Sequence, residues 1–232
     1  MNRLMTALAG LAAVTMATPA AASVQVTFPG TVPLPANNDF KTQLAGLGLV
    51  GIASTGASLI LNSDAMITFE LLGTESGFSD RFTTISVPGL SYTENTSFQN
   101  DFNSPIAIGS AFFSAGSLSG RLNFSAVGGL PATVGQTGFG IYVPQGLASG
   151  GTLNTFYIAY DDQPTNPDRD YDDMIIRAVV RSVDRAVPEP ATWAMMLVGF
   201  AGIGMAVRRD RQKSSFLKSL EQGREVALDA RR

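Results

Sequence analysis

Short runs in which apolar and polar residues alternate recur along the chain, and they constrain its fold more than any other feature. The runs are rich in Val, Ile, Thr, Phe and Tyr, which suit a pleated strand with one buried face. The clearest examples are residues 24–28, 66–72, 81–87, 121–127, 139–143, 155–160 and 174–180. Segments rich in Gly, Pro, Asn and Ser separate the runs, as at residues 86–97 and 144–154. Roughly eight to ten such strands predict an all-β body, a β-sandwich of the jelly-roll type, whereas residues 39–51 fit either a short helix or a loop.

The residue inventory excludes several kinds of function. The chain contains no Cys and no His among its 232 residues. Disulfide bonds, thiolate nucleophiles, zinc fingers and Ser-His-Asp catalysis are therefore all ruled out. Residues 23–190 carry 7 Lys and Arg against 15 Asp and Glu, a net charge of −8. Such an acidic body predicts no nucleic-acid partner, because phosphate binding requires clustered cations.

The first residues have the pattern of a secretory signal peptide. Arg3 precedes an apolar run, and the small residues Ala20 and Ala22 stand two apart ahead of Ser23. This order predicts a signal-peptide helix over residues 1–22 that is cut after Ala22. The body then covers residues 23–186.

The C-terminal part has three pieces, which together occupy residues 187–213. A Pro188-Glu189-Pro190 triplet is followed by 17 uncharged residues, 191–207, and then by the basic residues Arg208, Arg209 and Arg211. A helix of that length spans roughly 25 Å, close to the thickness of a hydrocarbon core. Trp193 at one border and the arginines at the other are typical of membrane flanks. We therefore predict a single transmembrane helix here, with the basic side in the cytoplasm.

These residues resemble the PEP-CTERM sorting signal. Pro188, Glu189 and Pro190, followed by Trp193 and Ala194, match its PEPxxWA form. The resemblance implies that an exosortase-like membrane protease recognises and cleaves the segment. The protein would be exported, anchored in the inner membrane by its C-terminal helix, and then moved to the cell surface or the extracellular space. Residues 214–232 extend beyond the usual end of such signals, as an amphipathic or disordered cytoplasmic tail.

An aspartate-rich segment between two predicted strands suggests a metal site. Carboxylates this close together repel one another unless a cation or arginine neutralises them, and oxygen ligands from loops suit Ca²⁺. We consider calcium the only candidate cofactor. Strand alternation would place Asp170 and Asp172 on one side and Asp173 on the other, so a single site would use only part of the set. The candidate calcium ligands are Asp161, Asp168, Asp170, Asp172 and Asp173.

An alternative for these aspartates stays open. The segment could be a solvated loop with Asx turns, in which Asp172 or Asp173 pairs with Arg169 or Arg177.

A second carboxylate also has two possible roles. Glu75 lies in a Gly73-x-Glu75-x-Gly77-Phe78 turn that is similar to a stretch found in PEP-CTERM proteins. It could be a binding residue or a solvated turn carboxylate.

We expect a non-enzymatic exported protein that serves the envelope or an exopolysaccharide matrix. One alternative is a calcium-dependent carbohydrate-binding module that uses the loop from Asp161 to Asp173. A second alternative is a secreted hydrolase that uses Glu75 or an aspartate of that loop, because a glycosidase needs only two carboxyl groups.

Overall fold

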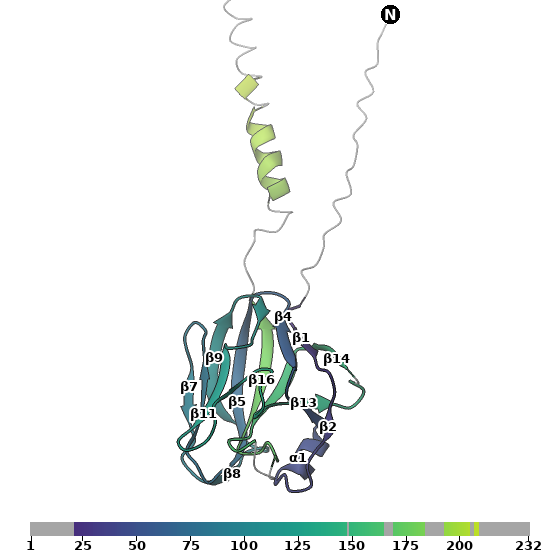
Figure 1. Cartoon of the computed structure of the whole chain (residues 1–232). Coiled ribbons are helices and arrows are strands. Elements are labelled where there is room, and N and C mark those ends of the chain that lie inside the picture. Colours follow the sequence, from purple (N-terminus) through teal and green to yellow (C-terminus); the bar gives the residue numbers. More distant parts are fainter. Residues whose placement is uncertain (1–20, 148, 165–168, 184–192, 205–206, 209–232) are drawn as a thin grey trace, which may run out of the picture. The chain divides into compact units, whose positions relative to one another are not determined.

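The computed structural model describes residues 21–147, 149–164, 169–183, 193–204 and 207–208. The chain divides into two units, of which Pro19–Val183 is the body and the other contains the C-terminal segment. The described part of the body is built from antiparallel strands and one short helix, α1 (Lys41–Gly46) (Figure 1). The prediction of an all-β body is therefore confirmed.

The strands of the body form three sheets, and every strand pairing is antiparallel. The largest sheet has eight strands in the order β2 (Val32–Pro33), β3 (Leu49–Ala53), β13 (Phe139–Pro144), β15 (Thr155–Tyr160), β16 (Met174–Ser182), β5 (Ala65–Glu75) and β8 (Phe98–Asn100), with β9 (Ile106–Phe113) also paired to β5. A four-stranded sheet has the order β10 (Gly116–Ser117), β4 (Ser58–Leu61), β1 (Val24–Thr27) and β14 (Gly150–Leu153). The other has the order β12 (Ala132–Thr133), β11 (Leu122–Ala126), β6 (Asp80–Thr84) and β7 (Ser91–Thr93).

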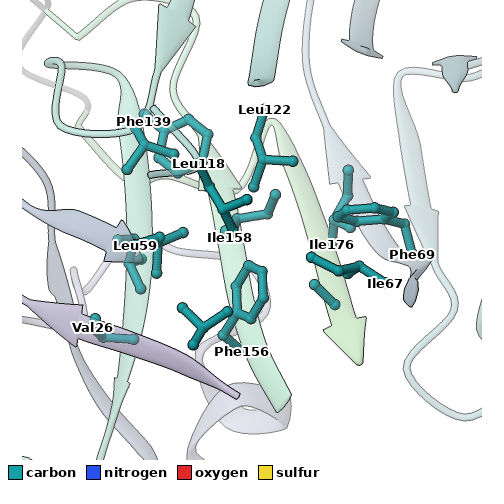
Figure 2. Close-up of a cluster of buried hydrophobic side chains, with 14 of the residues drawn as sticks. Val26, Leu59, Ile67, Phe69, Leu118, Leu122, Phe139, Phe156, Ile158 and Ile176 are labelled. Carbon is teal, nitrogen blue, oxygen red and sulfur yellow. The ribbon is translucent and has the colours of Figure 1, made fainter. Parts of the chain in front are cut away.

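The main hydrophobic core joins the eight-stranded sheet to both four-stranded sheets. Figure 2 shows Val26 of β1 and Leu59 of β4 gathered with Phe156 and Ile158 of β15. On the side of the other small sheet, aromatic rings continue the core. Their centroids are 5.2 Å apart for Phe69–Phe82, 5.3 Å for Phe82–Phe124 and 5.0 Å for Phe124–Tyr160. Because Tyr160 is the last residue of β15, this series of rings reaches the end of that strand.

A second core cluster contains the residues that alternate with those of the main core. On β13, Ile141 belongs to the main core, whereas the next residue, Tyr142, belongs to the second cluster. Helix α1 contributes Leu44 to this cluster, and Phe40 just before the helix is fully buried in it. Central strands of the large sheet are thus apolar on both faces, which explains why β3 and β13 read as nearly continuous apolar runs.

The seven sequence runs named as strands all contain strands in the structure, namely β1, β5, β6, β11, β13, β15 and β16. The undecided segment 39–51 holds α1 and the first part of β3. Two segments expected to be only separators also contain strands, β7 and β14. These short strands are polar or glycine-rich and lie at the ends of their sheets, where little side-chain burial marks them in the sequence.

Ala22, the last residue of the predicted signal peptide, packs into the body. Ala22 is only 2% exposed and lies in the main core, and its N–H donates to Ser182 Oγ at 2.8 Å. Residues 1–20 of the predicted signal-peptide helix lie outside the described part of the chain.

In the C-terminal unit, residues 193–204 are helical, and their large apolar side chains are exposed, among them Trp193 and Phe200. None of the helices that the structure describes combines the length and the apolar character required to cross a membrane. The predicted transmembrane helix over 191–207 is therefore not found among the described residues, and residues 191–192 and 205–206 of it lie outside them.

Candidate functional site

A crossing between sheets positions the first part of the candidate site. Strand β5 belongs to the eight-stranded sheet and ends at Glu75, and β6 begins at Asp80 in a four-stranded sheet. The chain therefore passes from one layer to the other through a turn of four residues, 76–79, as the glycine-rich pattern around Gly77 predicts. In this turn the Phe78 N–H donates to Ser76 Oγ at 2.9 Å, and both Ser76 and Asp80 are buried.

The segment between β15 and β16 supplies the second part. The Asp161 N–H donates to the Gly138 carbonyl at 2.9 Å, and its Oδ1 accepts the Gln163 N–H at 3.1 Å in an Asx turn. The Ser76 hydroxyl donates to Asp162 Oδ2 at 2.9 Å, which links this segment to the β5–β6 crossing. At the other end of the segment, Asp173 Oδ2 accepts the Asp162 N–H at 2.6 Å.

These two parts bring three carboxyl groups together, and we call Asp80, Asp162 and Asp173 the acidic triad. One carboxylate oxygen from each residue lies within 4.8 Å of the other two. Asp80 and Asp162 are 0% and 3% exposed. Such a group of oxygen donors can hold a hard cation, or it can retain protons.

Glu94, which follows β7, borders the acidic triad. Its Oε1 accepts the Asp80 N–H at 2.9 Å, while the Glu94 N–H donates to the Asp80 carbonyl at 3.0 Å. Among the described residues, no hydrogen bond of normal geometry reaches Glu94 Oε2 or either carboxylate oxygen of Asp80, and these atoms are buried. The Ser76 and Thr74 hydroxyls lie near enough to oppose slightly the rise that burial causes in the pKa values of Asp80 and Glu94, but the Ser76 hydroxyl donates to Asp162. Unsatisfied buried carboxylates are rare in folded proteins because their desolvation is costly.

Burial and mutual repulsion make these carboxyl groups weak acids. Burial, and then the charges of Glu94 and Asp162, raise the pKa of Asp80 to about 8. Burial also raises the pKa of Glu94 to about 7, although the hydrogen bond from the Asp80 N–H opposes the rise. The pKa of Asp173 rises to about 9, mainly through burial, with the charges of Asp162 and Asp80 adding to it. A cation bound among them would lower all three values, since it favours the charged forms.

The aromatic core borders the acidic triad. The Tyr160 hydroxyl donates to the Leu130 carbonyl, and the backbone carbonyl of Asp162 accepts the Leu130 N–H at 2.9 Å. Burial raises the pKa of Tyr160, and the charges of Asp80 and Asp162 contribute to the rise. The backbone at Gly129 also packs closely against this region: a Cβ at that position would lie 2.9 Å from the Asp162 Cβ.

Asp170 and Asp172 form a separate acidic pair beside the segment that precedes α1. Asp172 Oδ2 accepts the Asp39 N–H at 2.6 Å, and Asn37 donates to Asp170 Oδ2 at 3.2 Å. Burial, followed by the interaction with Asp170, raises the pKa of Asp172 to about 9. The residues on either side of Asp170, Arg169 and Tyr171, have φ angles of 47° and 60°, so the backbone turns sharply here.

The five aspartates predicted to be calcium ligands are thus distributed over different places. Asp173 belongs to the acidic triad, whereas Asp170 and Asp172 belong to the separate pair. Asp161 makes the Asx turn at the start of the segment, and Asp168 lies outside the described residues.

Sequence reasoning missed three residues of this region: Asp80, Asp162 and Glu94. Asp162 stood in the acidic segment but was not chosen as a ligand. Asp80 and Glu94 are far from that segment in the chain, and only the pairing of β6 with β7 and the crossing from β5 bring them near it. The one sequence signal is that Asp80 alternates in strand β6, DRFTT, with the buried residues Phe82 and Thr84, and Glu94 has no such signal.

The structure also tests the expected pairing of Asp172 or Asp173 with an arginine. Arg177 pairs with Glu70 across β16 and β5 at 2.7 Å. Within the part of the chain that the structure describes, this is the only salt bridge, so Asp172 and Asp173 form none there. Glu75 is partly buried at the end of β5, and its N–H donates to the Asp172 carbonyl at 3.1 Å.

The residues of the predicted sorting motif are only partly described. Trp193, Ala194 and Arg208 are exposed helical residues. Pro188, Glu189, Pro190, Arg209 and Arg211 lie outside the described residues, as does the tail 214–232.

Comparison with known proteins identifies this end of the chain. A family model described as the PEP-CTERM protein-sorting motif matches residues 186–212. No curated protein and no solved structure matches the chain. The matched range contains the Pro188-Glu189-Pro190 triplet, the apolar run and the basic residues. The chain is therefore a PEP-CTERM domain-containing protein, whose sorting motif occupies residues 186–212.

Proposed function

We propose that this protein is a non-enzymatic component of the cell surface or of an exopolysaccharide matrix, delivered by its C-terminal motif. The motif match at residues 186–212 carries the proposal, because a PEP-CTERM motif marks an exported protein that is anchored transiently in the membrane and sorted by an exosortase. Pro188 and Pro190 favour an extended backbone around Glu189, which suits recognition by a protease.

The character of the C-terminal segment supports transient anchoring. Its helical residues expose large apolar side chains, including Trp193, Leu197 and Phe200. Such a surface is costly in water and is stabilised by lipid. The basic residues that follow would hold their side of the segment in the cytoplasm until the motif is cleaved.

The body supports a role in binding or scaffolding rather than in catalysis. Its opposed layers of antiparallel strands suit a β-sandwich of the jelly-roll type, an architecture that presents broad surfaces. The chain also lacks the Cys and His residues on which many hydrolases rely. The alternatives of a calcium-dependent carbohydrate-binding module and of a secreted hydrolase remain predictions.

The sorting role can be tested by changing the triplet in the native host. We expect Glu189→Ala and Pro190→Ala each to leave the full-length precursor in the inner membrane, because the protease loses its recognition segment. The wild-type protein should appear at the cell surface or in the medium with a smaller mass. Fractionation and intact-mass measurement check both results.

Glu225→Ala is the matched control, because it removes one carboxylate from the tail beyond the matched residues. It should be sorted like the wild type. If the triplet variants are processed and released normally, the triplet is no recognition element and the proposed sorting role is wrong.

A further inference from the structure

The acidic triad has the dimensions of a cation site. Two oxygens bound to the same Ca²⁺ at about 2.4 Å stand at most about 4.8 Å apart. One oxygen each from Asp80, Asp162 and Asp173 meets that limit for every pair. The three residues come from the start of β6 and from the two ends of the segment between β15 and β16.

A second observation points to a ligand at this place. Asp80 is 0% exposed, and no hydrogen bond of normal geometry from a described residue reaches either of its carboxylate oxygens, one of which lies in the acidic triad. The nearby Ser76 hydroxyl donates to Asp162 instead. Glu94, 7% exposed and hydrogen-bonded to the Asp80 N–H, has a second unsatisfied oxygen. In addition, neither Asp80 nor Asp173 forms an ion pair with any described lysine or arginine. Buried charges without hydrogen bonds or counter-ions are strongly destabilising, so a positive ligand would satisfy several requirements at once.

The chemistry of the donors selects the kind of ion. All the side-chain donors are carboxylate oxygens, and the chain has no His or Cys to favour zinc or copper. Three carboxylates from a strand end and a loop suit the larger, less directional shell of Ca²⁺. We propose that Asp80, Asp162 and Asp173 bind a Ca²⁺ ion, with Glu94 as a neighbouring carboxylate that adds to the negative potential of the site.

The position of this site gives the ion a structural role. Asp80 belongs to a four-stranded sheet, while Asp162 and Asp173 lie at the two ends of the connection between β15 and β16 of the eight-stranded sheet. One ion bound to all three residues therefore joins the two layers where the aromatic core ends at Tyr160. It performs the cross-linking that a disulfide bond would perform in an exported protein with cysteines.

Calcium binding to the full-length protein in mild detergent tests the proposal. After removal of metal with EDTA, titration calorimetry should give one Ca²⁺ per chain with a Kd on the order of 10⁻⁴ M, as in extracellular calcium modules. A hundredfold excess over that Kd should raise the melting temperature by about 5–10 °C. Wild-type protein that binds no Ca²⁺ at 10 mM, on the order of a hundred times that Kd, would show that protons alone satisfy the triad and would overturn the proposal.

Matched variants locate the site. Asp80→Asn should weaken binding by about tenfold or more, because it removes a charged ligand without changing the size of the side chain. Without calcium this variant should be at least as stable as the wild type, because the amide is neutral without having to take up a proton, so lost binding cannot reflect unfolding. Asp64→Asn, which changes a carboxylate that accepts the Ala115 N–H elsewhere in the body, should bind like the wild type.

Two further results would overturn either the location of the site or the choice of ion. Full binding by Asp80→Asn together with loss in Asp172→Asn would place the ion at the Asp170–Asp172 pair and overturn the assignment. Mg²⁺ at equal concentration should bind less tightly than Ca²⁺, because it requires shorter bonds and a stricter octahedron. Equal binding of the two ions would overturn the choice of calcium.

Discussion

At the scale of single residues, the buried carboxyl groups control how the stability of the metal-free protein responds to pH. Asp80, Glu94 and Asp173 have pKa values raised to about 8, 7 and 9. In the unfolded chain the same groups titrate near pH 4. Between about pH 4 and the raised pKa of each group, the native state therefore holds a proton that the unfolded state has released.

We therefore expect the metal-free protein to lose stability as the pH rises from about 5 to about 9. When the native state binds more protons, the free energy of unfolding falls with pH, by up to about 1.4 kcal/mol per pH unit for each group. Urea denaturation in EDTA at a series of pH values measures this slope. Asp80→Asn should flatten it, and stability that rises over this range would contradict the raised pKa values.

At the scale of elements, the tight approach of the 127–130 turn to the acidic segment holds the site together. Gly129 stands just after β11, where an added Cβ would lie 2.8 Å from the Ala126 Cβ and 2.9 Å from the Asp162 Cβ. These contacts are too short for two carbon atoms, so one of the backbones would have to move.

Gly129→Ala should accordingly destabilise the body by about 1–3 kcal/mol, the usual cost of overpacking. It should also weaken Ca²⁺ binding, because Asp162 is the residue displaced. Gly30→Ala is the control, since nothing lies within 4 Å of a Cβ at that position. Equal stability of the two variants in urea would show that the turn and the segment are not in rigid contact.

The same elements show how far the sequence could predict the structure. Strands with alternating apolar residues, such as β5 and β15, were predicted because burial on one face leaves a period of two in the sequence. The short strands β7 and β14 were missed because their pairing depends on neighbours, and few of their side chains are buried. An acidic loop after β15 could be predicted as well. The proximity of Asp162 to Asp80 could not be predicted, because these residues are 82 positions apart and come together only through the packing of two layers.

At the scale of the whole molecule, the last strand of the body is a central one. Strand β16 lies between β15 and β5 in the eight-stranded sheet and is paired with β5 from Ile175 to Ser182 (Figure 1). Its Ile176 and Ala178 belong to the main core, and Ile175 belongs to the second cluster.

A chain that ends after Asp173 should therefore fail to fold, because the large sheet is split into two parts and both cores lose their centre. A chain that ends after Val183 retains every strand and should unfold cooperatively. Circular dichroism during thermal melting distinguishes the two. A cooperative transition in the shorter chain would show that β16 is dispensable.

The central place of β16 also bears on the order of events during secretion. The ribosome makes residues 174–182 after every other strand of the body, and the sorting motif follows almost immediately. Until those nine residues have emerged, β5 and β15 have no strand between them, and the large sheet cannot close. We therefore expect the nascent body to stay open until β16 has been made, so that a narrow translocation pore could accept it before it closes.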